Sequence, residues 1–262
     1  MPTRTIRLLS AIALLALAAA AAPTAAETLV TGETKAVITK LSVDDAFKAT
    51  PGLFGDLAAE GRAWIDKNKR AADQEFRDNP GFFADGRVWS FDRNYKLLSA
   101  VGPYTSVLRL DYSFMGGAHP NTDVDTILWD SATQKRVSVR PFFIETKDNG
   151  PTMTALATLI RNAVAKEKKA RGVEVAADPA KDEWLKAIEP SLLKLGPLAL
   201  ARSTERGKSG GLSVHLPPNA VGPHVEGGYT VLIPWRAFAS HLSPEGAAVF
   251  GGNPLKDKAG DE

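Results

Sequence analysis

The sequence predicts an α+β fold, in which an antiparallel β-rich N-terminal part with one long helix precedes two helices packed on a small sheet. Two kinds of periodicity predict it. Apolar residues recur at spacings of three and four, as in amphipathic helices, over 56–78, 152–171 and 182–195. Apolar and polar residues alternate, as in strands, within 82–145 and again at 212–216 and 229–233.

The N-terminus has the order of a secretory signal peptide. Arg4 and Arg7 precede an apolar run over 8–22, and Thr24 and Ala26 fit the −3 and −1 positions of a cleavage site. The run is shorter than the roughly 20 residues that a spanning helix needs. We therefore expect residues 1–26 to be removed, which leaves a periplasmic or secreted protein with no membrane span.

Composition narrows the function classes. The chain has 32 Lys+Arg and 30 Asp+Glu, and its first 26 residues hold two Arg and no acid, so 30 of each remain after cleavage. This balance predicts no nucleic-acid binding, which needs a basic face. The sequence has no cysteine, so neither disulfides nor thiol chemistry is available. About 235 residues remain, enough for one large domain or two small ones.

The order of the elements suggests where the domains divide. Residues 27–44 are extended in composition, Pro51-Gly52 breaks the chain, and Asn79-Pro80-Gly81 ends the first helix. The second helix ends at the cap Gly172, and the third is bent at Pro190. Ser243 is placed to cap a last short helix. The expected parts are a β-rich domain over 27–145, an α+β domain over 146–250 and a disordered tail over 251–262.

No catalytic or metal-binding signature stands out. The four histidines are far apart, and none forms an H-x-x-x-H pair. His119 with Asp123 and Asp125 could join a metal site, but two carboxylates on the solvent face of a strand explain the pattern as well. GKSGG at 207–211 lacks the first half of a phosphate-binding loop. We expect no catalytic residue, metal or cofactor.

The segment MGGAHPN at 115–121 is the most unusual of the chain. Gly116 or Gly117 is expected to adopt positive φ, and Pro120 fixes the exit of the turn. One interpretation is a tight structural turn formed by these three residues. The other is a rigid loop that displays His119, with Asn121 beside it.

Two parts of the chain resemble a family. Tyr112, Gly116-Gly117-Ala118-His119 and Asn121, then Asp130, Thr133, Lys135 and Phe142-Phe143, resemble a motif of the extracytoplasmic module shared by the anti-sigma-V factor, which is a lysozyme receptor, and the accessory region of a peptidoglycan deacetylase. Gly222-Pro223, Gly227-Gly228, Ile233-Pro234 and Phe238 match its second part more loosely. Gln134 replaces the family's usual glycine, and the aromatic expected after the first proline of the linker is absent. The resemblance implies the α+β fold described above.

The resemblance also implies a role. It favours an envelope binding protein that recognises a lysozyme-type muramidase or a peptidoglycan-related ligand, through His119, Asn121, Asp123, Asp125 and Trp129. A cell-wall glycan-acting enzyme and an envelope structural factor remain alternatives. An enzyme should show convergent titratable groups, whereas a binding protein should expose apolar or aromatic side chains, such as Trp89, Trp129 or Trp235.

Overall fold

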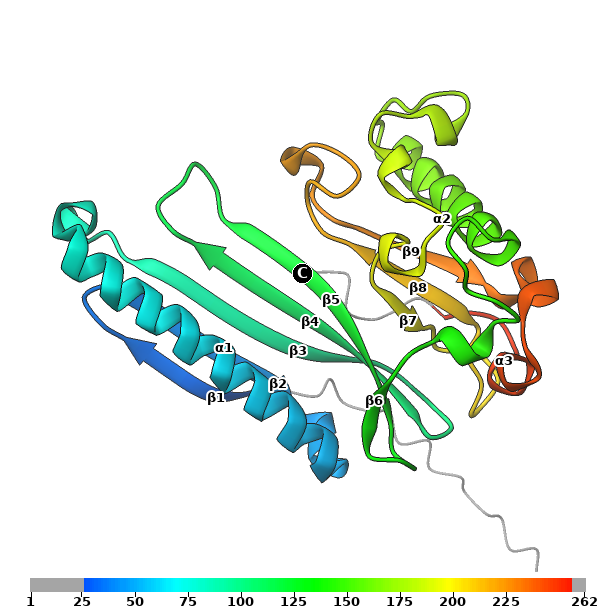
Figure 1. Cartoon of the computed structure of the whole chain (residues 1–262), viewed down its shortest axis with the longest axis horizontal. Helices are drawn as coiled ribbons and strands as arrows, with labels where there is room; N and C mark the ends of the chain where they lie inside the picture. The colour runs from blue at the N-terminus through cyan, green and yellow to red at the C-terminus, as the bar shows by residue number, and fades with distance from the viewer. Residues whose placement is uncertain (1–25, 256–262) are drawn as a thin grey trace, which may run out of the picture.

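The computed structural model describes residues 26–255 and has an α+β fold (Figure 1). The expected signal peptide lies outside these residues, except for Ala26. The larger sheet follows chain order: β1 (Ala26–Glu33), β2 (Val37–Asp44), β3 (Trp89–Val101), β4 (Tyr104–Phe114), β5 (Asn121–Asp130) and β6 (Lys135–Val137). The smaller sheet holds β7 (Leu198–Leu200), β8 (Gly211–Leu216) and β9 (Tyr229–Pro234). The α-helices are α1 (Pro51–Asp78), α2 (Pro151–Ala170) and α3 (Pro244–Val249).

Neighbouring strands are antiparallel except β2 and β3, which are parallel. A parallel pair needs a long crossover, and α1 supplies it across one face of the larger sheet. The helix begins at Pro51, five residues before the predicted start, because proline is tolerated in a first helical turn where no intrahelical N–H bond is lost. Gly61 lets the helix approach the sheet, since a Cβ there would lie 2.5 Å from Leu41 Cδ1.

The smaller sheet packs against the opposite face of the larger one. Ser99 Oγ donates to Leu200 O at 2.5 Å, and Leu200 N donates to Ser106 Oγ at 3.2 Å, which docks β7 on the larger sheet. The other face of the smaller sheet carries Leu212, Val214 and Val231, which pack with the apolar stripe of α2. The layers therefore run α1, larger sheet, smaller sheet, α2 (Figure 1).

One predicted helix is absent. Residues 182–195 form only two short 3₁₀ turns, η5 (Leu185–Ala187) and η6 (Leu192–Lys194). The carboxylate of Asp182 accepts from the N–H groups of Ala176, Trp184 and Leu185, which stabilises a local turn. Pro190 then disfavours helix at the residue before it. The apolar spacing in this segment reflects side chains such as Leu185 and Leu195 that reach the core from irregular backbone.

The C-terminal segment is structured further than predicted. Leu255 N donates to Arg202 O, and Thr204 N donates to Asn253 O, so residues 251–255 lie against 202–209 rather than in a disordered tail. Residues 256–262 lie outside the described part. Ser243 caps α3 as predicted, because its side chain accepts from Gly246 N at 3.0 Å.

The main core cluster spans the predicted domain boundary. Val101 and Leu128 of the larger sheet pack in the same cluster as Met153 and Ile160 of α2. The division at residue 145 stays a prediction.

In the described range 26–255, no helix combines the length and the apolar character needed to cross a bilayer.

Candidate binding site

The β4–β5 loop is a tight turn built on one glycine. Ser113 pairs with Asn121 at the end of the ladder, and the five residues after Phe114 are all exposed. Gly116 has a φ of +81°, and an ideal Cβ there would lie 2.7 Å from Phe82 Cζ. Gly117 is outside the left-handed region. The prediction that one of the two glycines adopts positive φ is therefore met by Gly116.

The β8–β9 loop covers residues 217–228 and includes a short 3₁₀ turn, η7 (His224–Glu226). Asn219 has a φ of +70° and Gly227 a φ of +71°, which bend the loop at both ends. Glu226 fixes its base, since its Oε2 accepts from Lys168 Nζ at 2.7 Å. Both this loop and the β4–β5 loop lie along the upper edge of Figure 1.

The two loops meet at a pair of histidines. The rings of His119 and His224 are stacked, with centroids 4.0 Å apart and planes inclined by 16°. His119 Nδ1 lies 3.0 Å from Pro120 O, and His224 Nδ1 lies 3.4 Å from Asn219 Nδ2, so each ring is also oriented by its own loop. We call segments 115–121 and 217–228 together the histidine junction.

Exposed apolar side chains occur in or beside both loops. Met115 is 46% exposed and Val225 is 91% exposed, one in each loop. Tyr112, just before the β4–β5 loop, and Phe82, against Gly116, are also exposed. Exposed apolar groups beside fixed polar ones are typical of protein-recognition surfaces.

The arrangement offers less for catalysis. In-plane lone pairs of stacked, nearly parallel rings do not converge on one point, which is what a shared metal ion needs. Across residues 26–255, no group of three or more histidine and acidic side chains could hold a metal ion.

The residues predicted from the sequence are dispersed. His119 and Asn121 lie in the histidine junction, and both are exposed. Asp123 and Asp125 follow on β5 and are exposed as expected, but Asp125 Oδ2 lies 2.9 Å from Arg109 Nη2 and is therefore partly neutralised. Asp130, further along, accepts from Ala132 N and Thr133 Oγ1 within its own turn.

Trp129 was wrongly predicted as a binding residue. It is 4% exposed and lies in the core between α1 and the larger sheet. It shares a strand face with Asp123 and Asp125, but α1 covers only its end of β5, where a Cβ on Gly52 would be 3.5 Å from Trp129 Cζ2. Trp89 and Trp235 are half-buried, so these tryptophans do not provide the exposed aromatic surface.

A buried polar network lies beneath α1 and is a structural feature. Arg93 donates to both carboxylate oxygens of Asp111 at 2.5 Å, and its guanidinium lies 4.5 Å from the ring centre of Trp64. Glu60 of α1 accepts from Arg109, Arg136 and the hydroxyl of Tyr95. Burial raises the pKa of Tyr95, so it stays a neutral donor. Sequence periodicity missed this network because Arg109 and Asp111 alternate with leucines along β4, which indicates a solvent face. In the folded protein, α1 covers that face.

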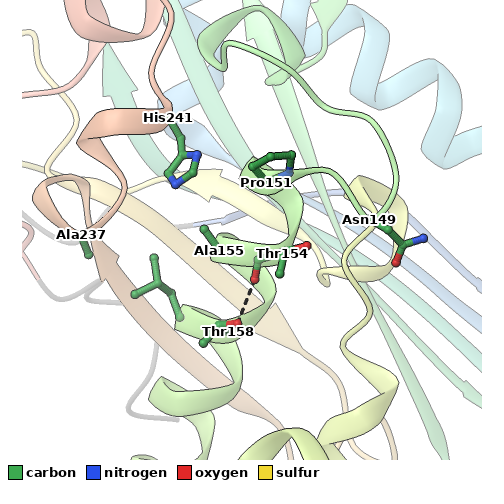
Figure 2. Close-up of a pocket in the computed structure, with 8 residues that line it drawn as sticks. Asn149, Pro151, Thr154, Ala155, Thr158, Ala237 and His241 are labelled. Carbon is green, nitrogen blue, oxygen red and sulfur yellow. Dashed lines mark hydrogen bonds between the residues drawn. The ribbon is translucent and has the colours of Figure 1, made fainter.

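A shallow groove of about 590 Å³ runs along the outer face of α2 (Figure 2). Its lining includes Pro151, Thr154, Ala155 and Thr158 of the helix, facing Ala237 and His241. His241 Nδ1 lies 3.2 Å from Thr152 Oγ1. The lining offers one imidazole and otherwise threonine, alanine and other neutral side chains, so it holds no convergent reactive groups.

Sequence reasoning missed His224, Asn219 and Val225. The signal that could have found them is the second family-like stretch, whose matching Gly222-Pro223 and Gly227-Gly228 flank His224.

Comparisons with known proteins identify the fold. No family model matches the sequence, and no curated protein matches it. Several solved structures are similar, and two of them are crystal structures of DUF3298 proteins. A DUF3298 family protein from Pseudomonas aeruginosa PAO1 has a TM-score of 0.57 and 17% identity, covering 88% of this chain and 99% of that one. A DUF3298 family member from Bacteroides fragilis NCTC 9343 has a TM-score of 0.55 and 13% identity, covering 84% and 91%. The chain therefore has the fold of DUF3298 proteins.

Proposed function

We propose that this protein is an envelope binding protein that recognises a partner protein through the histidine junction. One observation carries the proposal. Two loops from different sheets are brought together by His119 and His224, and they present Met115 and Val225 to solvent. Exposed apolar side chains on a fixed frame lose little entropy on binding, which is how a small surface gains affinity.

The proposed location is the periplasm or the exterior. It rests on the signal-like order of residues 1–26. Cleavage before Glu27 would leave strand β1 almost whole, since Glu27 already pairs with Val43. N-terminal sequencing of the protein from the envelope of its host tests this proposal. A chain that still begins at Met1 in that fraction would contradict it.

The first ligand to test is a lysozyme-type muramidase. The resemblance to a lysozyme receptor module motivates this choice, and peptidoglycan fragments are the second choice. Lysozymes are often basic, and the exposed Asp123 and Asp125 follow the histidine junction on β5. Complementary charge at the edge of an interface speeds association and makes affinity depend on salt.

Calorimetry of residues 27–262 with lysozyme, at low and moderate salt, is the direct experiment. We expect binding that weakens as salt rises and that is lost in Asp123→Lys/Asp125→Lys. A matched control is Asp178→Lys/Glu183→Lys, which makes the same charge change at two exposed acids on another part of the surface. Binding should survive in the control. Equal loss in both variants would point to nonspecific charge attraction.

Two results would replace the proposal. Absence of heat and of co-elution with any muramidase would remove lysozyme as the ligand. Turnover of a chitooligosaccharide that depends on His119 would favour a glycan-acting enzyme instead.

A further inference from the structure

We propose that Lys168 on α2 is a positioning residue, whose buried ammonium holds the β8–β9 loop where His224 stacks on His119. The inference rests on the proposed binding role of the histidine junction, and it names the residue that sets the geometry of that junction.

Lys168 is 1% exposed, and its ammonium bridges the two sides of His224 in the loop. Nζ donates to Val221 O at 2.7 Å and to Glu226 Oε2 at 2.7 Å. Val221 comes three residues before His224 and Glu226 two residues after it. One cation therefore closes the base of the segment that carries the imidazole.

A buried lysine at position 168 is not explained by its contribution to the stability of the fold. Ile160, Val164 and Lys168 follow each other at spacings of four on the buried side of α2, so the stripe calls for an apolar residue at 168. Lysine is almost never fully buried without a partner. Replacing a buried ion pair by apolar groups is often neutral or stabilising. A lysine here is better explained by a need to fix the loop than by a need for stability.

We call the contacts of Lys168 with Val221 and Glu226 the clamp. Neighbouring groups hold the same segment of the loop. Arg171 Nη1 donates to Glu226 O at 3.3 Å and to Gly228 O at 3.0 Å, and the Tyr229 hydroxyl donates to Glu226 Oε2 at 2.5 Å. A Cβ on Gly222 would lie 2.8 Å from Lys168 Nζ, so this glycine leaves room for the ammonium. The last turns of α2 thus hold both ends of 221–228, while His224 itself stays free to meet His119.

Burial opposes ionisation of Glu226, but the hydrogen bond from Lys168 keeps the pKa of this carboxyl below its usual range. The Glu226 carboxyl is therefore charged at neutral pH and accepts from Lys168 as a carboxylate.

NMR signals of the histidine rings report directly whether the clamp keeps His224 stacked on His119, and the measurement needs no ligand. The chain has four histidines, and stacked rings shift each other's Cε1–Hε1 signals through ring currents. The test variant is Lys168→Met/Glu226→Gln, which removes both charges together and leaves neither buried alone. We expect the His119 signal to move to its position in His224→Ala, while the signals of His215 and His241 stay in place.

The control is Lys186→Met, which removes an exposed lysine paired with Glu183 at 2.7 Å. It should leave all four signals unchanged. Glu226→Gln alone is the second variant. It should shift the NMR signals of His119 and His224 in the same direction as the double variant shifts them.

Unchanged His119 and His224 signals in a folded double variant would overturn the proposal. So would loss of folding in both the double variant and Glu226→Gln, because the clamp would then be needed for folding itself. Failure of wild-type protein to bind any muramidase, with its stacked signals intact, would count against the proposed function and not against the clamp.

Discussion

The imidazole of His119 lies flat against that of His224, at a centroid distance of 4.0 Å. One ring comes from the hairpin of the larger sheet and the other from the connection of the smaller sheet. Since β7 is docked through Ser99 and Ser106, towards the opposite end of β4 from this hairpin, the stacked rings add a further contact between the two sheets. The strength of the contact between the two rings determines how rigid the proposed binding surface is.

The stack should be measurable as a coupling energy. In a double-mutant cycle of His119→Ala and His224→Ala, we expect an interaction of about 0.5–1 kcal/mol, at the lower end for aromatic pairs because the rings are partly solvated. Urea unfolding of the four proteins gives the value. Additive effects of the two replacements would mean that the rings are adjacent without attracting each other.

Replacing Gly116 by valine should lower the stability of the protein far more than replacing Gly117 by valine. Gly116→Val should cost about 1–3 kcal/mol, because it forces a branched residue into positive φ and towards the Phe82 ring. Gly117→Val should cost much less, since Gly117 lies outside the left-handed region and its nearest neighbour is 3.9 Å from an ideal Cβ. Thermal melts of the two variants beside wild type test the contrast. Equal losses would contradict the assignment of the strained position.

Breaking the Arg93–Asp111 ion pair beneath α1 should strongly lower the stability of the protein. Arg93→Met leaves the carboxylate of Asp111 buried without its bidentate partner, which costs about 3–5 kcal/mol. Arg93→Met/Asp111→Leu should recover much of that loss. Lys40→Met is the surface control, because its ammonium is 4.0 Å from Asp92 and half exposed, so its effect should stay below about 1 kcal/mol. Denaturant midpoints of the three variants, compared with wild type, test this order of stability losses.

His215 should make the protein less stable in mild acid. Burial lowers the pKa of His215 from 6.5 to about 4. The unfolded chain therefore binds this proton first as pH falls, and stability declines from about pH 6.5 and levels off near pH 4. The loss from this residue should be about 2 kcal/mol between about pH 7 and pH 5.

His215→Gln is the comparison for this slope, because it removes the titrating ring. Urea unfolding at several pH values should show wild type losing more stability than the variant over this window. Parallel pH profiles would mean that His215 has the same pKa in the folded and unfolded states, and burial would then not perturb it.

The amino-acid pattern by itself determined the fold class and most elements of this protein. Helix α2 and strands β8 and β9 lie within a few residues of their predicted limits, and β3 to β6 lie within the predicted β region 82–145, because these periodic patterns are local. Only the tertiary structure decided the irregular path of 182–195, since the turn at Asp182 competes with the same apolar spacing.

The same distinction holds for the site. The unusual glycines and the exposed imidazole of His119 are visible in a short stretch of sequence, and so are the two carboxylates on β5. The contact with His224, the burial of Trp129 and the clamp by Lys168 each depend on chain segments that only packing brings together. Local periodicity reports which face of a strand or helix a side chain takes, but it does not say which other element covers that face.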